Sequence, residues 1–122
     1  ADILRKSLDS LCCQSVDKNI FEVIIVDNNS NDTTREVVKR YCAENNNFKY
    51  IFEGKQGHSQ ARNRGLIESK SEFVAFLDDD IKVEPDYFAE LIKTYKSHTD
   101  AIGVGGIDLY SSMYIKKEPP NA

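Results

Sequence analysis

A run of apolar residues that ends in three adjacent carboxylates constrains this chain more than any other feature. The run extends from Phe73 to Leu77, and Asp78, Asp79 and Asp80 follow it without a gap. A short apolar run rich in Phe and Val predicts a strand that is buried on both faces of a sheet. Adjacent carboxylates repel one another and cannot be buried unpaired. The three carboxylates therefore predict that the chain leaves the sheet at this point, where their side chains can reach solvent or bind a cation.

The three carboxylates admit two interpretations, a metal site and a helix-capping turn. If the backbone stays extended, Asp78 and Asp80 lie on one side while Asp79 points away. Two carboxylates on one side can hold Mg²⁺ or Mn²⁺ and leave room for water and phosphate. Ligand sites in open α/β sheets lie just beyond the carboxyl ends of the strands. Taken alone, however, three consecutive Asp residues are more often a turn that caps the next helix.

The rest of the chain alternates helical and strand patterns. Leu4, Leu8 and Leu11 recur at a helical spacing and open the chain with a helix. Later helices are expected to begin near the capping residues Asp32 and Ser59 and with Pro85 in a first turn. The predicted strands are Phe21–Val26, Phe48–Phe52, Phe73–Leu77 and Ala101–Ile107. This alternation predicts an α/β domain with a mainly parallel sheet.

Composition narrows the class of protein. The chain has 122 residues, enough for one domain, and 40% of them are hydrophobic and 30% charged, as in ordinary globular proteins. The net charge of -4 makes nucleic acid an unsuitable partner unless one face is basic. No apolar run approaches the length of a membrane span. Cys12, Cys13 and Cys42 fit neither a disulfide framework nor a zinc site, so we expect reduced, buried thiols in a cytosolic protein.

A glycine-containing loop before the third helical pattern offers a place for an anion. The loop runs from Gly54 to Ser59, and Arg62 and Arg64 follow it. Backbone N–H groups at a helix start and two guanidinium groups suit a phosphate. A polar helix with solvated arginines explains the same residues equally well.

Three blocks of this sequence resemble the family 2 glycosyltransferases of the GT-A fold. The blocks are Val26–Ser30, Ala61–Gly65 and Phe76–Asp80, and Ser7–Gln14 is similar to the first helix of that family. The resemblance implies a Rossmann-like nucleotide-diphospho-sugar transferase fold, with a mainly parallel sheet flanked by helices. It implies a nucleotide-sugar-binding domain over residues 1–115 and a tail over residues 116–122.

The resemblance also assigns roles to individual residues. Asp27 and Asn28 would hydrogen-bond the nucleotide base, and Arg62 and Asn63 would line the nucleotide pocket. The three carboxylates would form a DXD-type motif, whose residues in this sequence are Asp78, Asp79 and Asp80. In that motif Asp78 and Asp79 would contact the nucleotide, and Asp78 and Asp80 would bind the divalent cation, Mn²⁺ or Mg²⁺, that bridges the diphosphate. A cation held there would stabilise the leaving nucleoside diphosphate.

Two departures from the family pattern limit what is expected of this chain. The family has a further strand between those that correspond to Phe21–Val26 and Phe73–Leu77, and this sequence starts after it. The general base of the family lies downstream of the DXD motif, and no residue here takes that place. We therefore expect donor binding without sugar transfer by the chain itself, with His58 as the one local candidate for a substitute base.

The resemblance implies partners and a location as well. The donor would be a nucleotide-sugar, a UDP-sugar in the first place, and the acceptor an unidentified glycan or lipid-linked sugar in polysaccharide biosynthesis. The protein would be cytoplasmic or peripheral to the inner face of the membrane, and it would be able to form a homo-oligomer. We predict that the strands Phe21–Val26 and Phe73–Leu77 run parallel, with Asp27 and Asp78 emerging at the same edge of the sheet.

Two other functions stay open on the sequence. A receiver-type phosphoacceptor domain is also α/β and gathers Asp residues around Mg²⁺. Such domains resemble chains that begin on an acidic strand, however, and Lys117 is a poor candidate for the lysine that they need. The second alternative is a nucleotide-binding module without turnover.

Overall fold

The computed structural model describes residues 2–100, which fall into two compact units divided between Pro85 and Asp86. Each unit is described here by itself. The predicted strand Ala101–Ile107 and the predicted tail at residues 116–122 lie outside the described residues.

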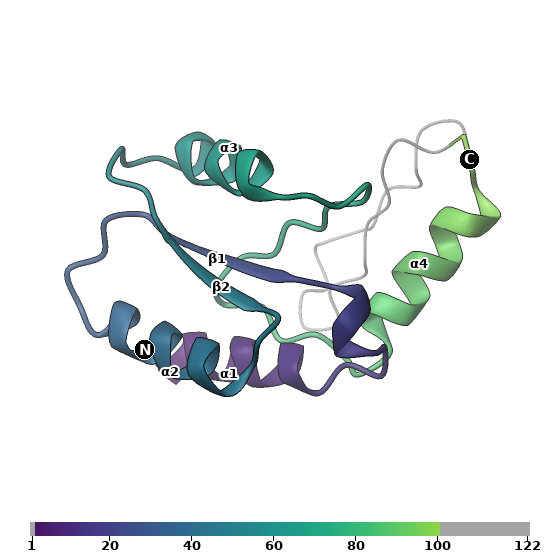
Figure 1. Cartoon of the computed structure of the whole chain (residues 1–122), viewed down its shortest axis with the longest axis horizontal. Helices are drawn as coiled ribbons and strands as arrows, with labels where there is room; N and C mark the ends of the chain where they lie inside the picture. The colour runs from purple at the N-terminus through teal and green to yellow at the C-terminus, as the bar shows by residue number, and fades with distance from the viewer. Residues whose placement is uncertain (1, 101–122) are drawn as a thin grey trace, which may run out of the picture. The chain divides into compact units, whose positions relative to one another are not determined.

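Two parallel strands form the sheet of the first unit (Figure 1). β1 (Val23–Asp27) pairs with β2 (Phe48–Phe52), and Asp27 lies opposite Phe52 at the carboxyl end. The connection between them is α2 (Thr34–Glu44), so β1, α2 and β2 form one βαβ unit. The predicted parallel α/β arrangement is confirmed, although β1 begins two residues later than expected.

Helices cover both faces of this small sheet. α1 (Asp2–Cys12) packs beside α2 on one face, and α3 (His58–Glu68) lies on the other, where it contacts β1 (Figure 1). Apolar residues of α1 and α2 supply most of the core: the side chains of Leu8, Leu11, Val37 and Val38 are all less than 9% exposed. A 3₁₀ turn, Lys18–Ile20, joins α1 to β1. The N-cap of α2 is Thr33, which makes no side-chain cap hydrogen bond, so the predicted capping by Asp32 is displaced by one residue. Asp32 instead accepts a hydrogen bond from the Thr34 N–H at 3.0 Å.

The segment Phe73–Leu77 is not a strand, and this prediction is wrong. It pairs with neither β1 nor β2, and Phe73 and Phe76 are 57% and 48% exposed. A strand exists only through its hydrogen-bonded neighbour, and within residues 2–100 no segment fills that position beside Phe73–Leu77. The family resemblance implies a further strand at this place.

Two predicted helix starts are also displaced. α3 begins at His58 after Gly57, so Ser59 lies inside the first turn and does not cap it. The second unit contains α4 (Tyr87–Ser97), which begins after Asp86 instead of at Pro85. In α4 the rings of Tyr87 and Phe88 contact each other, with centroids 5.8 Å apart.

The chain that follows the three carboxylates runs along α1. The Ser7 hydroxyl donates to the Ile81 carbonyl at 2.7 Å, and the Val83 N–H donates to the Ser10 hydroxyl oxygen at 3.2 Å. The side chain of Val83 is only 7% exposed, so this segment is anchored in the core. Polar residues on the buried side of α1 therefore fix where the turn of Asp78–Asp80 lies.

The three cysteines are free thiols, as expected, but only partly buried. Cys12 and Cys42 are half-buried and Cys13 is exposed, so the expectation of buried thiols is wrong for Cys13. Burial raises the pKa of the Cys12 and Cys42 thiols. Within residues 2–100, none of the helices has the length and hydropathy needed to cross a membrane.

Candidate donor-binding site

Asp27 ends β1 as a buried carboxylate that is only 4% exposed. One carboxylate oxygen accepts the Ser30 N–H at 2.9 Å, and the other accepts the Tyr50 hydroxyl at 2.7 Å. Burial alone would raise the pKa of the Asp27 carboxyl, but the hydrogen bonds from Ser30 and Tyr50 outweigh it and lower the pKa below its ordinary value. Asp27 is therefore charged at neutral pH and holds the turn after β1.

The turn after β1 is shaped by these internal bonds. Asn29 has a φ of 61°, in the left-handed region that Asn tolerates better than most residues. Arg35 and Lys39 lie over the ring of Tyr50, with their charged groups 5.9 and 5.7 Å from its centroid. Burial and the Asp27 carboxylate raise the pKa of the Tyr50 hydroxyl, which thus stays a donor to Asp27. The predicted contact between Asp27 and a nucleotide base stays a prediction.

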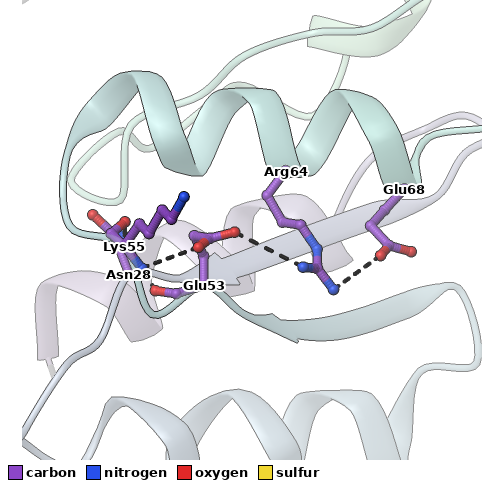
Figure 2. A network of polar contacts seen from close by, with 5 residues as sticks. All are labelled: Asn28, Glu53, Lys55, Arg64 and Glu68. Carbon is purple, nitrogen blue, oxygen red and sulfur yellow. Dashed lines mark hydrogen bonds and ion pairs between the residues drawn. The ribbon is translucent and has the colours of Figure 1, made fainter.

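Asn28 connects this turn to the loop that precedes α3 (Figure 2). Its amide nitrogen donates to the carbonyls of Glu53 and Lys55, at 3.2 and 2.7 Å, and its amide oxygen accepts the Gly57 N–H at 2.8 Å. Both ends of the side-chain amide are thus bonded to the loop. Base recognition at this turn, if it involves Asn28, has to use the remaining acceptor capacity of the amide oxygen or the backbone.

A network of ion pairs that the sequence did not reveal continues from this loop along α3. Figure 2 shows Arg64 reaching from α3 between Glu53 and Glu68, with nitrogen–oxygen distances of 3.8 and 3.2 Å. Lys49 on β2 contacts Glu68 from the other side at 3.3 Å. The pair Arg64 and Glu68 has the i, i+4 spacing of helical ion pairs, which is the one signal that sequence could have offered. The contact between Arg64 and Glu53 could not be predicted in this way, because it depends on how α3 docks against the sheet.

Arg62 and Asp78 are brought together although they are 16 positions apart in the chain. The Arg62 guanidinium lies 3.8 Å from a carboxylate oxygen of Asp78 and 5.5 Å from the centre of the Phe76 ring. Both side chains are more than half exposed, so the pair is accessible to a ligand. Asn63, the neighbour of Arg62 on α3, is exposed as well. Two of the three sequence blocks therefore meet on one accessible surface.

The three carboxylates form an exposed turn and not an extended segment, so the predicted alternation of their side chains is wrong. The Ile81 N–H donates to the Asp78 carbonyl at 3.3 Å, which closes a turn over Asp79 and Asp80. Because Phe73–Leu77 is no strand of the sheet, the prediction that it runs parallel to Phe21–Val26 and ends with Asp78 at the same edge as Asp27 is wrong for the described residues.

A divalent cation would find only part of its ligands here. Within residues 2–100 no three His, Cys, Asp or Glu side chains are arranged to hold a metal ion. Exposed carboxylates in a turn nevertheless offer the hard oxygen ligands that Mg²⁺ and Mn²⁺ prefer. These residues therefore fit a cation whose remaining ligands come from phosphate and water. They do not fit an ion held by protein alone.

The structure is similar to a solved glycosyltransferase. The crystal structure of S. aureus TarS 1-349 superposes with a TM-score of 0.73 and 28% identity, over 90% of this chain and 35% of that one. The crystal structure of TarS 1-349 in complex with UDP-GlcNAc gives a TM-score of 0.69 with the same identity, over 90% of this chain and 34% of that one. The fold of this chain is therefore the GT-A fold of TarS, in part.

Relatives identified by sequence lead to the same family. EpsH of Bacillus subtilis is 35% identical over 99 residues, which are 81% of this chain and 28% of EpsH. The GalNAc(5)-diNAcBac-PP-undecaprenol beta-1,3-glucosyltransferase of Campylobacter jejuni is 38% identical over 80 residues, 64% of this chain and 25% of that enzyme. The chain thus spans about a quarter of the length of these relatives.

A family model covers almost the whole sequence. The model described as "Glycosyl transferase family 2" matches residues 1–121, which include all three blocks and α1. A receiver-type phosphoacceptor domain, the main alternative on the sequence, is therefore the wrong interpretation. This chain belongs to glycosyl transferase family 2.

Proposed function

We propose that this chain is the donor-binding part of a glycosyltransferase and binds a nucleotide-diphospho-sugar, with a UDP-sugar as the first candidate. The observation that carries the proposal is the exposed pair of Arg62 and Asp78, which joins the second and third family blocks on one accessible surface. The TarS complex with UDP-GlcNAc supports the choice of uracil as the base.

The proposed arrangement divides the donor between two groups of residues. The turn of Asp27 and Asn28 would lie against the base, and Arg62 and Asn63 would line the nucleotide pocket. A guanidinium group suits the diphosphate because it presents several N–H donors in a plane. The first N–H groups of α3 have no side-chain cap and are a further place for negative charge.

The carboxylates of the turn would hold a divalent cation, with Asp78 and Asp80 as its protein ligands and Asp79 against the nucleotide. Such a cation offsets the negative charge that develops on the leaving nucleoside diphosphate. Arg62 would keep Asp78 oriented towards the same side as its own guanidinium, because the two side chains are already paired. Cation and arginine would then act on one diphosphate.

The acceptor is proposed from a relative alone. The Campylobacter jejuni relative carries an undecaprenol-linked glycan in its name, so a lipid-linked sugar is the acceptor that we propose for the whole protein.

Isothermal calorimetry with UDP, with and without Mn²⁺, tests donor binding. We expect Mn²⁺ to increase affinity, and Asp78→Asn and Asp80→Asn each to reduce the Mn²⁺-dependent affinity about tenfold or more, because each removes a ligand charge. Glu84→Gln is the matched control: it removes a nearby exposed carboxylate that is not a proposed ligand. Equal affinities for all four proteins would identify the three carboxylates as a simple capping turn.

A further inference from the structure

Glu53 connects the three parts of the proposed donor site through every polar group that it has. Its N–H donates to the Asp27 carbonyl at 2.9 Å, and its own carbonyl accepts the Asn28 amide at 3.2 Å. One carboxylate oxygen accepts the Lys55 N–H at 3.0 Å, and the other lies 3.8 Å from the Arg64 guanidinium. The turn after β1, the loop before α3 and α3 itself therefore meet at one residue (Figure 2).

The carboxylate of Glu53 is well shielded, which strengthens its effect on its neighbours. Its side chain is 17% exposed, against 26% for Glu68 and 40% for Arg64. The Nε of Arg64 is buried and, among the described residues, has no hydrogen-bond partner. Arg64 is thus held in place through the end of its guanidinium group, by Glu53 on one side and Glu68 on the other. Removing one partner of a partly buried ion pair leaves the other charge without compensation, which destabilises its position.

Arg64 and Arg62 belong to the same helix, α3, so a movement of α3 that displaces one of them also displaces the other. The two side chains are separated by two positions, or about 200° around the helix axis. Arg64 faces the sheet, where it contacts Glu53, and Arg62 faces the exposed turn, where it contacts Asp78. A rotation or shift of α3 that broke the first contact would also move Arg62 away from Asp78.

We propose that Glu53 is a positioning residue for nucleotide binding: it sets the place of α3, and hence of Arg62, relative to the turn of Asp27 and Asn28. The inference rests on the proposed function, because it assumes that the turn and Arg62 bind one nucleotide. Glu53 itself need not touch that nucleotide. Its role is to keep the turn of Asp27 and Asn28, proposed to lie against the base, at a constant distance from Arg62, proposed to bind the diphosphate.

The test compares Glu53→Gln with Glu68→Gln, two variants that each neutralise one carboxylate partner of Arg64. The Glu53 carboxylate ties Arg64 to the loop whose backbone is bonded to the turn after β1, whereas Glu68 is a residue of α3 itself. The two variants therefore separate a positioning role from a general loss of ion pairs. We expect Glu53→Gln to weaken UDP binding in Mn²⁺ about tenfold, as for truncation of a partly buried charge pair, and Glu68→Gln to change it less than about twofold. Calorimetry well below the unfolding temperature of each variant excludes a contribution from unfolded chains.

A second measurement asks whether Glu53 acts through Arg62. In the background of Arg62→Gln, adding Glu53→Gln should change UDP affinity by less than about twofold, because the residue that it positions is gone. A merely structural weakening would reduce affinity by the same factor in both backgrounds, and that result would overturn the inference. Equal effects of Glu53→Gln and Glu68→Gln would overturn it too.

Failure of this inference and failure of the proposed function give different results. If the unaltered chain does not bind UDP, with or without Mn²⁺, both are wrong. If the unaltered chain binds UDP and Glu53→Gln binds it equally well, only the role of Glu53 is wrong.

Discussion

At the scale of single residues, Asp27 shows how a charge can be kept inside a small domain. Its carboxylate is almost fully buried, yet both oxygens accept hydrogen bonds, from Ser30 and from Tyr50. Such bonds to the charged form compensate for the loss of water around it. Because the pKa of Asp27 is lowered in the folded chain, the charged carboxylate stabilises the fold.

The pH dependence of Asp27→Asn follows from that lowered pKa. At pH 7 the substitution should reduce the free energy of unfolding by about 1–3 kcal/mol, the cost of losing a hydrogen-bonded buried charge. The stabilisation is complete above the ordinary carboxyl pKa of about 3.9 and is lost as the pH falls through the lower folded value. Urea unfolding at pH 7 and pH 3 should therefore show a difference between variant and parent that shrinks at low pH. A difference independent of pH would contradict this account.

Sequence reasoning located Asp27 and Asn28 but not their partners. Both follow a β-branched run, and the carboxyl end of a strand is a reliable place to look for ligand residues. Tyr50 and Glu53 come from β2 and the residue after it, so their proximity to Asp27 depends on strand register. Register is a property of the sheet as a whole and is set by packing that no local pattern reveals.

At the scale of elements, α3 depends on a glycine at its start. Gly57 has a φ of 134°, a conformation that residues with a side chain rarely adopt, and its N–H is bonded to Asn28. Gly54 lies in the same loop and has no such conformation, and a Cβ there would meet Phe52 only at an ordinary contact distance of 3.6 Å. Gly54 is therefore a matched control for substitution of Gly57: both lie in one loop, but only Gly57 has the positive φ.

Gly57→Ala should lower the free energy of unfolding by roughly 1–3 kcal/mol, because alanine is strained at this φ. Gly54→Ala should change it by less than about 0.5 kcal/mol, as is usual for surface substitutions. Denaturant titration of both variants measures the difference. If Gly54→Ala proved the more damaging of the two, the loop conformation described here would be incorrect.

The elements that sequence predicted well are those that depend on local patterns. α1 and α2 carry leucine and valine at helical spacing, and Leu8, Leu11, Val37 and Val38 are buried in the core, although Leu4 is only half-buried. Phe73–Leu77 has an equally strong apolar pattern, but it needs a neighbouring strand to form hydrogen bonds. The turn at Asp78–Asp80 was misjudged for the same reason, since its extended form was inferred from that strand.

At the scale of the whole molecule, donor binding and sugar transfer are expected to separate. The relatives are several times longer than this chain, and the family resemblance places the general base downstream of the DXD motif. General-base catalysis typically contributes about 10²–10⁴-fold in rate. We therefore expect the 122-residue chain to bind UDP weakly and to transfer no sugar in a radiolabelled donor assay.

The control for that assay is a version of the protein extended at both ends, measured beside the 122-residue chain. Equal transfer by the short and the extended protein would contradict the prediction and make His58 a candidate base. Binding without transfer by both proteins would instead favour a nucleotide-binding module without turnover.

The βαβ unit has a consequence for the order in which the protein takes shape during synthesis. Every pair between β1 and β2 joins residues 25 positions apart, from Val23 with Phe48 to Asp27 with Phe52. Each of these pairs closes a loop of the same length, so none of them can form until the whole connection through α2 has been made. All the partners that hold the Asp27 side chain have been made once Tyr50 is added. The Asn28 side chain also needs Glu53, Lys55 and Gly57, so all the partners that hold the turn after β1 are present once synthesis reaches the start of α3.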